Sequence, residues 1–144
     1  SSVRNHFRGQ KFTLRRKDSG TLTLEVRAYD EGVALRYQLD VEGDASIQRE
    51  QTEFRFAGDH ELWAVYSAQG KYSKEKISET RGSIERPCVL EIPGGHVVAI
   101  AEAAMVDFAR MRLRKSEESP HTLVSDLQGQ VRSPMPLTTP SSAS

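Results

Sequence analysis

Short segments in which apolar and polar residues alternate, separated by clusters of turn residues, dominate this 144-residue chain. The clearest pair is residues 22–29 and 33–39, with a polar break at residues 30–32. Alternation with a period of two places every second side chain on the same face of a strand, so the pair predicts a β-hairpin. We expect Gly32 to supply the positive φ of its turn. The side chains expected on one face are Leu22, Leu24, Val26 and Ala28, opposite Val33, Leu35, Tyr37 and Leu39.

The same rhythm continues along the chain. Further strands are predicted at residues 12–16, 47–56, 62–67, 88–92, 97–102, 108–114 and 122–127. Many short strands with regular turns predict an all-β fold, an antiparallel β-sandwich. We assign residues 1–132 to that domain and expect a long, exposed polar excursion at 69–81. The Pro- and Ser-rich residues 133–144 are predicted to be a linker or a disordered tail.

Composition limits the classes of partner. Lys and Arg total 20, as do Asp and Glu, so the formal charge is zero and neither nucleic acid nor an anionic membrane is indicated. The basic clusters at 15–17 and 110–115 are interpreted as solvated strand faces. The sequence contains neither a membrane-spanning apolar stretch nor a signal peptide, and the missing initiator Met suggests a fragment or a mature form. Cys88 is the only cysteine and is predicted to be a small buried hydrophobe.

One carboxylate, Glu102, stands in the middle of the apolar or small run at residues 97–107. An ionised glutamate there loses hydration that a cation, a hydrogen-bond donor or protonation must replace. Two ordinary explanations remain open. Glu102 lies either at the end of a strand, tipped into solvent, or on the wet face of a helix over residues 99–112.

Motifs of catalysis are absent from the sequence. It contains no glycine-rich phosphate loop, no nucleophile elbow and no paired histidines. Glu102 and Asp107 could line one cleft, but their spacing does not establish a hydrolytic pair. Trp63, Tyr66 and Tyr72 could stack on sugar rings, and the alternative is a core tryptophan with tyrosines at the sheet edge.

Three strings point to one family. They are L-E-V-R-A-Y-D-E-G-V-A-L-R-Y at residues 24–37, Q-T-E-F-R-F at 51–56 and A-I-A-E-A-A-M-V-D-F-A-R-M-R-L at 99–113. In this order and separation they resemble the amino-terminal domain of glycoside hydrolase family 97. That family comprises bacterial calcium-dependent α-glucosidases and α-galactosidases of the starch-utilisation type, and the resemblance covers residues 3–140.

The resemblance implies a β-supersandwich of the galactose-mutarotase-like kind, packed against a catalytic (β/α)8 barrel in a periplasmic enzyme that acts on α-linked oligosaccharides. The family's calcium-ligating glutamate falls on Glu102, and the other protein ligands are barrel glutamates. The catalytic residues also belong to the barrel, so this chain is expected to be inactive alone. Calcium takes about six to eight oxygen ligands, and we therefore expect the site to be unfilled in this chain.

Two other functions stay open. The chain could be a free-standing carbohydrate-binding sandwich that uses Trp63, Tyr66 or Tyr72, or a structural module that docks another domain through an apolar face at residues 103–105. The surroundings of Glu102 separate these possibilities from the calcium hypothesis. An unpaired carboxylate at the rim of the sandwich would support calcium ligation, whereas a carboxylate buried against an arginine would oppose it.

Overall fold

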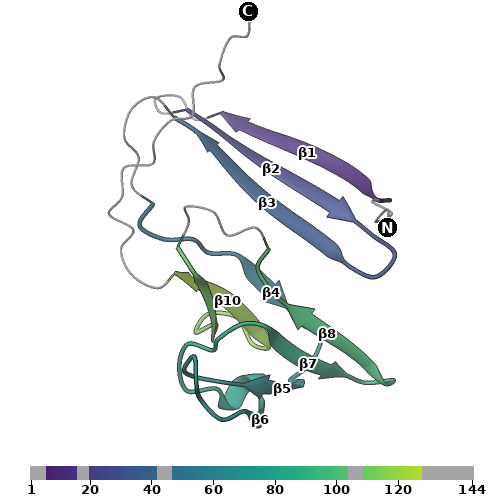
Figure 1. The fold of residues 1–144 in the computed structure, drawn as a ribbon, viewed down its shortest axis with the longest axis vertical. Helices are drawn as coiled ribbons and strands as arrows, with labels where there is room; N and C mark the ends of the chain where they lie inside the picture. Colours follow the sequence, from purple (N-terminus) through teal and green to yellow (C-terminus); the bar gives the residue numbers. More distant parts are fainter. Residues whose placement is uncertain (1–5, 16–19, 42–46, 104–108, 128–144) are drawn as a thin grey trace, which may run out of the picture. The chain divides into compact units, whose positions relative to one another are not determined.

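The fold is all-β, as predicted. A computed structural model describes residues 6–15, 20–41, 47–103 and 109–127, and within them every paired strand is antiparallel (Figure 1). The strands are β1 (Arg8–Arg15), β2 (Thr21–Ala28), β3 (Val33–Asp40), β4 (Glu53–Arg55), β5 (Glu61–Ala64), β6 (Ser73–Lys76), β7 (Cys88–Ile92), β8 (His96–Ile100), β9 (Met111–Lys115) and β10 (Thr122–Leu127), with a 3-10 helix, η1 (Ile77–Glu79). No helix of this described part is long and apolar enough to cross a membrane.

The chain divides into two compact units. The smaller unit comprises Ser1–Ala45 with Pro134–Ser144, and the larger comprises Ser46–Ser133. The predicted change from domain to tail after residue 132 stays a prediction, because residues 128–144 lie outside the described residues.

The smaller unit is a three-stranded sheet in the order β1-β2-β3. The predicted hairpin is confirmed residue by residue, since Leu24 lies opposite Tyr37 and Leu22 lies opposite Leu39. Strand β1 adds the third row, with Phe12 opposite Leu24. Cross-strand neighbours of this kind are the unit of sheet stabilisation, and apolar side chains of all three strands share one face, to which β1 contributes Phe12 and Leu14.

The predicted role of Gly32 is wrong. Its φ is not positive, and the connection is instead closed by the Tyr29 N–H, which donates to the Gly32 carbonyl at 2.8 Å. None of the residues of this connection has a positive φ. The glycine that the unit needs is Gly20, with φ +98°, because a Cβ there would lie 2.2 Å from the Asp40 carbonyl oxygen.

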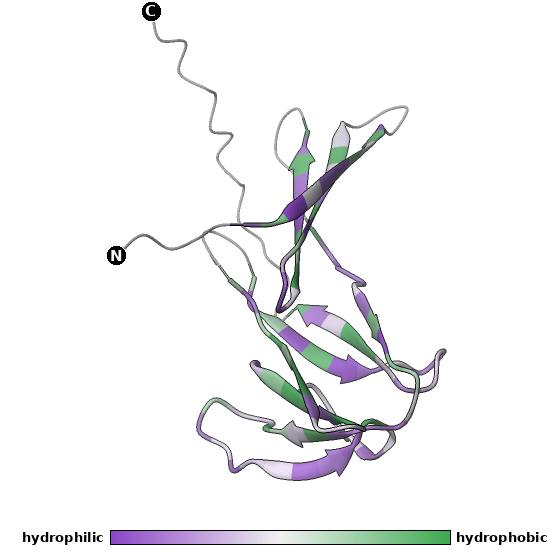
Figure 2. Cartoon of the chain, turned by 90° about the vertical axis from the view of Figure 1, so that its right-hand side faces the viewer, coloured by the Kyte–Doolittle hydropathy of each residue, from purple (hydrophilic) through white to green (hydrophobic). Residues whose placement is uncertain are grey.

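The two faces of the small sheet differ in chemistry, and the alternation is visible as bands along the strands (Figure 2). The face opposite the apolar rows carries charge, including Glu25, which pairs with Arg27 at 2.7 Å and Lys11 at 3.9 Å. None of the described residues of this unit is buried. Apolar side chains that are exposed on β1 and β3 are Phe12, Leu14, Val33, Leu35, Tyr37 and Leu39.

The larger unit is a sandwich of two sheets, β4-β10-β9 and β6-β5-β7-β8. Its strands β7 and β10 have the predicted bounds, whereas the predicted strand at 47–56 is reduced to β4 and that at 108–114 starts only at Met111. Both sheets contribute to one core, and an isolated bridge pairs Ile84 with Leu113. The buried core residues are Leu62, Ala64, Ile77, Ile84, Cys88, Leu90, Ile100, Met111, Leu113 and Leu123.

The polar segment at 69–81 is more ordered than an exposed excursion. Strand β6 pairs with β5 through all four of its residues, and η1 then places Ile77 in the core. Thr80 is also buried, with its hydroxyl donating to the Ile77 carbonyl at 2.9 Å. An edge strand takes its backbone hydrogen bonds from its neighbour, so it can form without the alternating apolar pattern that sequence analysis detects.

Cys88 is fully buried, as predicted. Burial among apolar core residues raises the pKa of its thiol to about 11, because the thiolate would lose its hydration there. The side chain therefore acts as a small apolar residue of β7 and not as a nucleophile.

Candidate functional site

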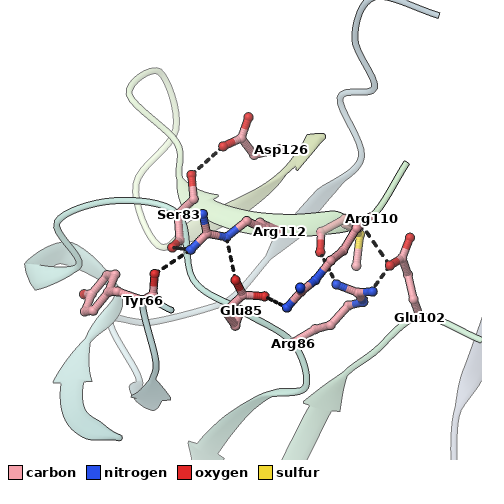
Figure 3. Close-up of polar contacts among 9 residues, drawn as sticks. Tyr66, Ser83, Glu85, Arg86, Glu102, Arg110, Arg112 and Asp126 are labelled. Carbon is pink, nitrogen blue, oxygen red and sulfur yellow. Dashed lines mark hydrogen bonds and ion pairs between the residues drawn. The ribbon is translucent and has the colours of Figure 1, made fainter. Parts of the chain in front are cut away.

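Three arginines and two glutamates meet in the larger unit, at the ends of three strands (Figure 3). Glu85 and Arg86 lie just before β7, Glu102 follows β8, Arg110 precedes β9 and Arg112 lies within it. The five side chains together carry one net positive charge. Because they come from both sheets of the sandwich, their contacts also connect the sheets.

Glu102 and Arg86 hold the backbone of Met111 between them. The Arg86 Nε lies 2.6 Å from the Glu102 Oε2, and the same oxygen accepts a hydrogen bond from the Met111 N–H at 3.0 Å. The Arg86 Nη1 donates to the Met111 carbonyl at 2.8 Å. We call this three-residue arrangement the Met111 clamp. It fixes the position of the carboxylate, because the side chains of Arg86 and Glu102 are only 9% and 17% exposed.

Glu85 forms the second part of the site. Its side chain is 7% exposed and pairs with Arg110 and with Arg112, whose Nε lies 3.3 Å from the Glu85 Oε1. The Arg112 Nη2 also donates to the carbonyl oxygens of Tyr66, at 2.6 Å, and Ser83, at 2.9 Å. In this Glu85 cluster the buried carboxylate is balanced by two guanidiniums, whereas the buried Arg112 Nε contacts Glu85 without a hydrogen bond.

The surroundings of Glu102 differ from both ordinary explanations. Strand β8 ends at Ile100, and the described residues of the run include no helix, so the helical alternative is wrong. Glu102 follows the strand but is partly buried against Arg86, not tipped into solvent. A carboxylate buried against an arginine is the arrangement expected to count against calcium ligation by Glu102.

The residues also do not complete a calcium site. Among the described residues, no group of three or more His, Cys, Asp or Glu side chains could hold a metal ion. Glu102 has one oxygen, Oε1, without a partner in this part of the chain, while Oε2 is engaged in the clamp. Glu102 could therefore supply one oxygen to a calcium site that other residues complete, but the described residues do not form a complete calcium site. Asp107 lies outside the described residues.

Trp63 is not a core residue, because its side chain points away from the core of the sandwich and is 39% exposed. Its indole N–H donates to Glu91 at 3.1 Å, and the Lys74 Nζ lies 5.9 Å from the centroid of its ring. Lys74 also bonds Glu91 at 2.7 Å and Glu61 at 3.0 Å; these bonds raise the pKa of the lysine, mainly through Glu91. The exposed indole ring of Trp63 is therefore held in place by charged neighbours on the same sheet surface.

The two candidate tyrosines have different surroundings. Tyr66 packs against the core, and its hydroxyl donates to Glu75 at 2.7 Å and accepts the Arg81 N–H at 3.2 Å. Burial, followed by the contact with Glu75, raises the pKa of the Tyr66 hydroxyl. Tyr72 is largely exposed just before β6. Trp63, Tyr66 and Tyr72 are thus used in three different ways, and their role in sugar binding stays a prediction.

Sequence reasoning missed most of the site. Glu85 and Arg86 were not singled out, and Arg112, assigned to a solvated face, is mostly buried beside Glu85. The alternation Arg110-Met-Arg-Leu-Arg114 does indicate that the arginines of β9 share a side. The alternation does not identify the carboxylate that pairs with these arginines, because Glu85 and Arg110 are 25 residues apart in the sequence.

Comparison with protein families gives one result. The family model described as "Glycosyl-hydrolase 97 N-terminal" matches residues 1–140. The comparison with curated proteins gave no match.

Proposed function

Because the chain belongs to the glycosyl hydrolase 97 N-terminal family, we propose that it is the non-catalytic part of an α-glycosidase whose catalytic domain is a (β/α)8 barrel. The substrates proposed for that enzyme are α-glucosides or α-galactosides, and its proposed compartment is the periplasm. The family match over almost the whole chain is the observation that carries this proposal. The absence of a catalytic motif from the sequence agrees with a supporting role.

Within this role, we propose that Glu102 contributes one oxygen to a calcium site that carboxylates of the barrel complete. Support comes from the I-A-E-A-A string at residues 100–104 and from Glu102 Oε1, which has no partner among the described residues. The Met111 clamp holds the other oxygen and so orients the carboxylate at the end of β8. Calcium bound there would supply positive charge beside the sugar that the barrel cleaves.

The test is the calcium dependence of the parent enzyme. We expect Glu102→Gln to raise the calcium concentration for half-maximal hydrolysis by at least about tenfold, because calcium then loses a charged ligand. Glu91→Gln is the matched control, since that carboxylate is exposed on the outer face of the four-stranded sheet. An unchanged calcium requirement in a folded Glu102→Gln enzyme would refute the role of Glu102.

A further inference from the structure

We infer that Arg86 acts as a built-in counter-cation that excludes a divalent cation from Glu102 in this chain. Cation binding at Glu102 then depends on carboxylates that another part of the enzyme supplies. The second statement rests on the proposed function, whereas the exclusion itself rests only on the contacts of the described residues.

The guanidinium of Arg86 occupies the Oε2 side of the Glu102 carboxylate and leaves a cation in this chain only Oε1. Its Nε lies 2.6 Å from the Glu102 Oε2, close to the distance at which calcium binds oxygen. Its Nη1 holds the Met111 carbonyl at 2.8 Å, which is the other oxygen of the clamp. Arg86 thus engages a carboxylate oxygen and a carbonyl oxygen, the two kinds of ligand that calcium prefers.

Charge repulsion between Arg86 and a divalent cation strengthens this exclusion. A doubly charged ion on Glu102 would lie within a few ångströms of a guanidinium that is nine-tenths buried, where water screens the repulsion weakly. The single negative charge of Glu102 is already balanced by Arg86. Glu85, the other carboxylate of the site, pairs with Arg110 and Arg112, so it offers no compensating charge.

Removal of the Arg86 side chain should therefore raise the affinity of this chain for a divalent cation at Glu102. It frees the Glu102 carboxylate and the Met111 carbonyl together, and it removes the like charge beside them. The Met111 N–H continues to hold Oε2, so the carboxylate keeps one of its two anchors. The exclusion is thus distinguishable from a purely structural role of Arg86, which would predict lost stability and no gain in cation binding.

The experiment measures cation binding to this chain by terbium luminescence and by calorimetric titration with calcium. We expect the affinity of Arg86→Gln to exceed that of the wild-type chain by at least about tenfold. Arg86→Lys keeps the charge and should show no gain. Arg110→Gln is the matched control, because it removes an arginine of the neighbouring Glu85 cluster without touching Glu102. The double variant Arg86→Gln/Glu102→Gln should return to the weak binding of the wild-type chain.

Two results would overturn the inference. One is a folded Arg86→Gln chain that gains no affinity, or whose gain persists in the double variant. The other is available even if Arg86→Gln does not fold: millimolar calcium raises the melting temperature of the wild-type chain but not of Glu102→Gln. Neither result bears on the calcium requirement of the parent enzyme, so failure of this inference and failure of the proposed function can be told apart.

Discussion

The two units of the molecule are built from the same alternating pattern but bury their side chains to different degrees. The smaller unit has apolar residues from all three strands on one face, and none of its described residues is buried. The larger unit has shorter strands, yet ten residues form a buried core between its two sheets. Alternation therefore determines which side chains share a face, whereas burial depends on a second layer over that face.

The ion pairs of the two units also differ, in sequence separation and in burial. Glu25 of the small sheet pairs with Arg27, two residues away on the same strand, and the Arg27 side chain is 35% exposed. Glu85 of the sandwich pairs with Arg110 and Arg112, which are distant in sequence, and is almost completely buried. A local pair with a partly exposed partner gains little because water competes for it, while buried pairs are costly to break. The comparison predicts that substitutions in the sandwich have much larger effects.

The largest difference is expected for matched leucines. Leu113→Ala removes a fully buried side chain and should lower the free energy of unfolding by about 3 to 5 kcal/mol. Leu35→Ala removes a side chain that is 48% exposed and should cost less than about 1 kcal/mol. Urea unfolding of the two variants measures both values. Equal losses would break the comparison, because they would require a cover over the apolar face of the small sheet.

A second pair of variants compares the carboxylates. Glu85→Gln leaves the mostly buried Arg112 without its counter-charge, and we expect a loss of about 3 kcal/mol in the free energy of unfolding. Glu25→Gln should produce only a small fraction of that loss, because solvent replaces the contact with Arg27. Denaturant titration of both variants at one salt concentration decides the point. A larger effect at Glu25 than at Glu85 would reverse the assignment of the two environments.

The smallest of the three effects is a pH dependence that belongs to the sandwich alone. The folded-state pKa of Cys88, about 11, lies above its ordinary value of 9.0. Stability from the protonated thiol is therefore present below about pH 9 and is lost as the pH rises toward 11, by up to about 2 to 3 kcal/mol. Thermal unfolding from pH 8 to 11 should show this decline. In Cys88→Ala the component should vanish, and an identical decline in that variant would assign it to other groups.

The fold was largely predictable because its elements are local. The hairpin of β2 and β3 follows from alternation over eight residues, and the register of Leu22 with Leu39 follows from the short connection. Sequence analysis failed where a strand lacked that signal. β6 is composed of polar residues and forms because it pairs with β5, and the local sequence of β6 does not predict that pairing.

The candidate site was predictable only at one residue. Glu102 stands out because a lone carboxylate in an apolar run needs a partner, but the sequence does not identify that partner as Arg86. The two residues are separated by the whole β7–β8 hairpin and meet through the folded chain. Prediction of such a contact requires knowledge of how the two sheets pack, which single-sequence patterns do not contain.

The Met111 clamp also ties together the two ends of a short stretch of chain. Because the Met111 N–H binds the Glu102 side chain, residues 102 and 111 stay close whatever lies between them. Closing a loop costs entropy that grows only slowly with its length, by about 0.6 kcal/mol for each doubling. A longer chain between residues 102 and 111 would therefore add little to the entropy cost of closing the clamp, which holds the end of β8 beside the start of β9.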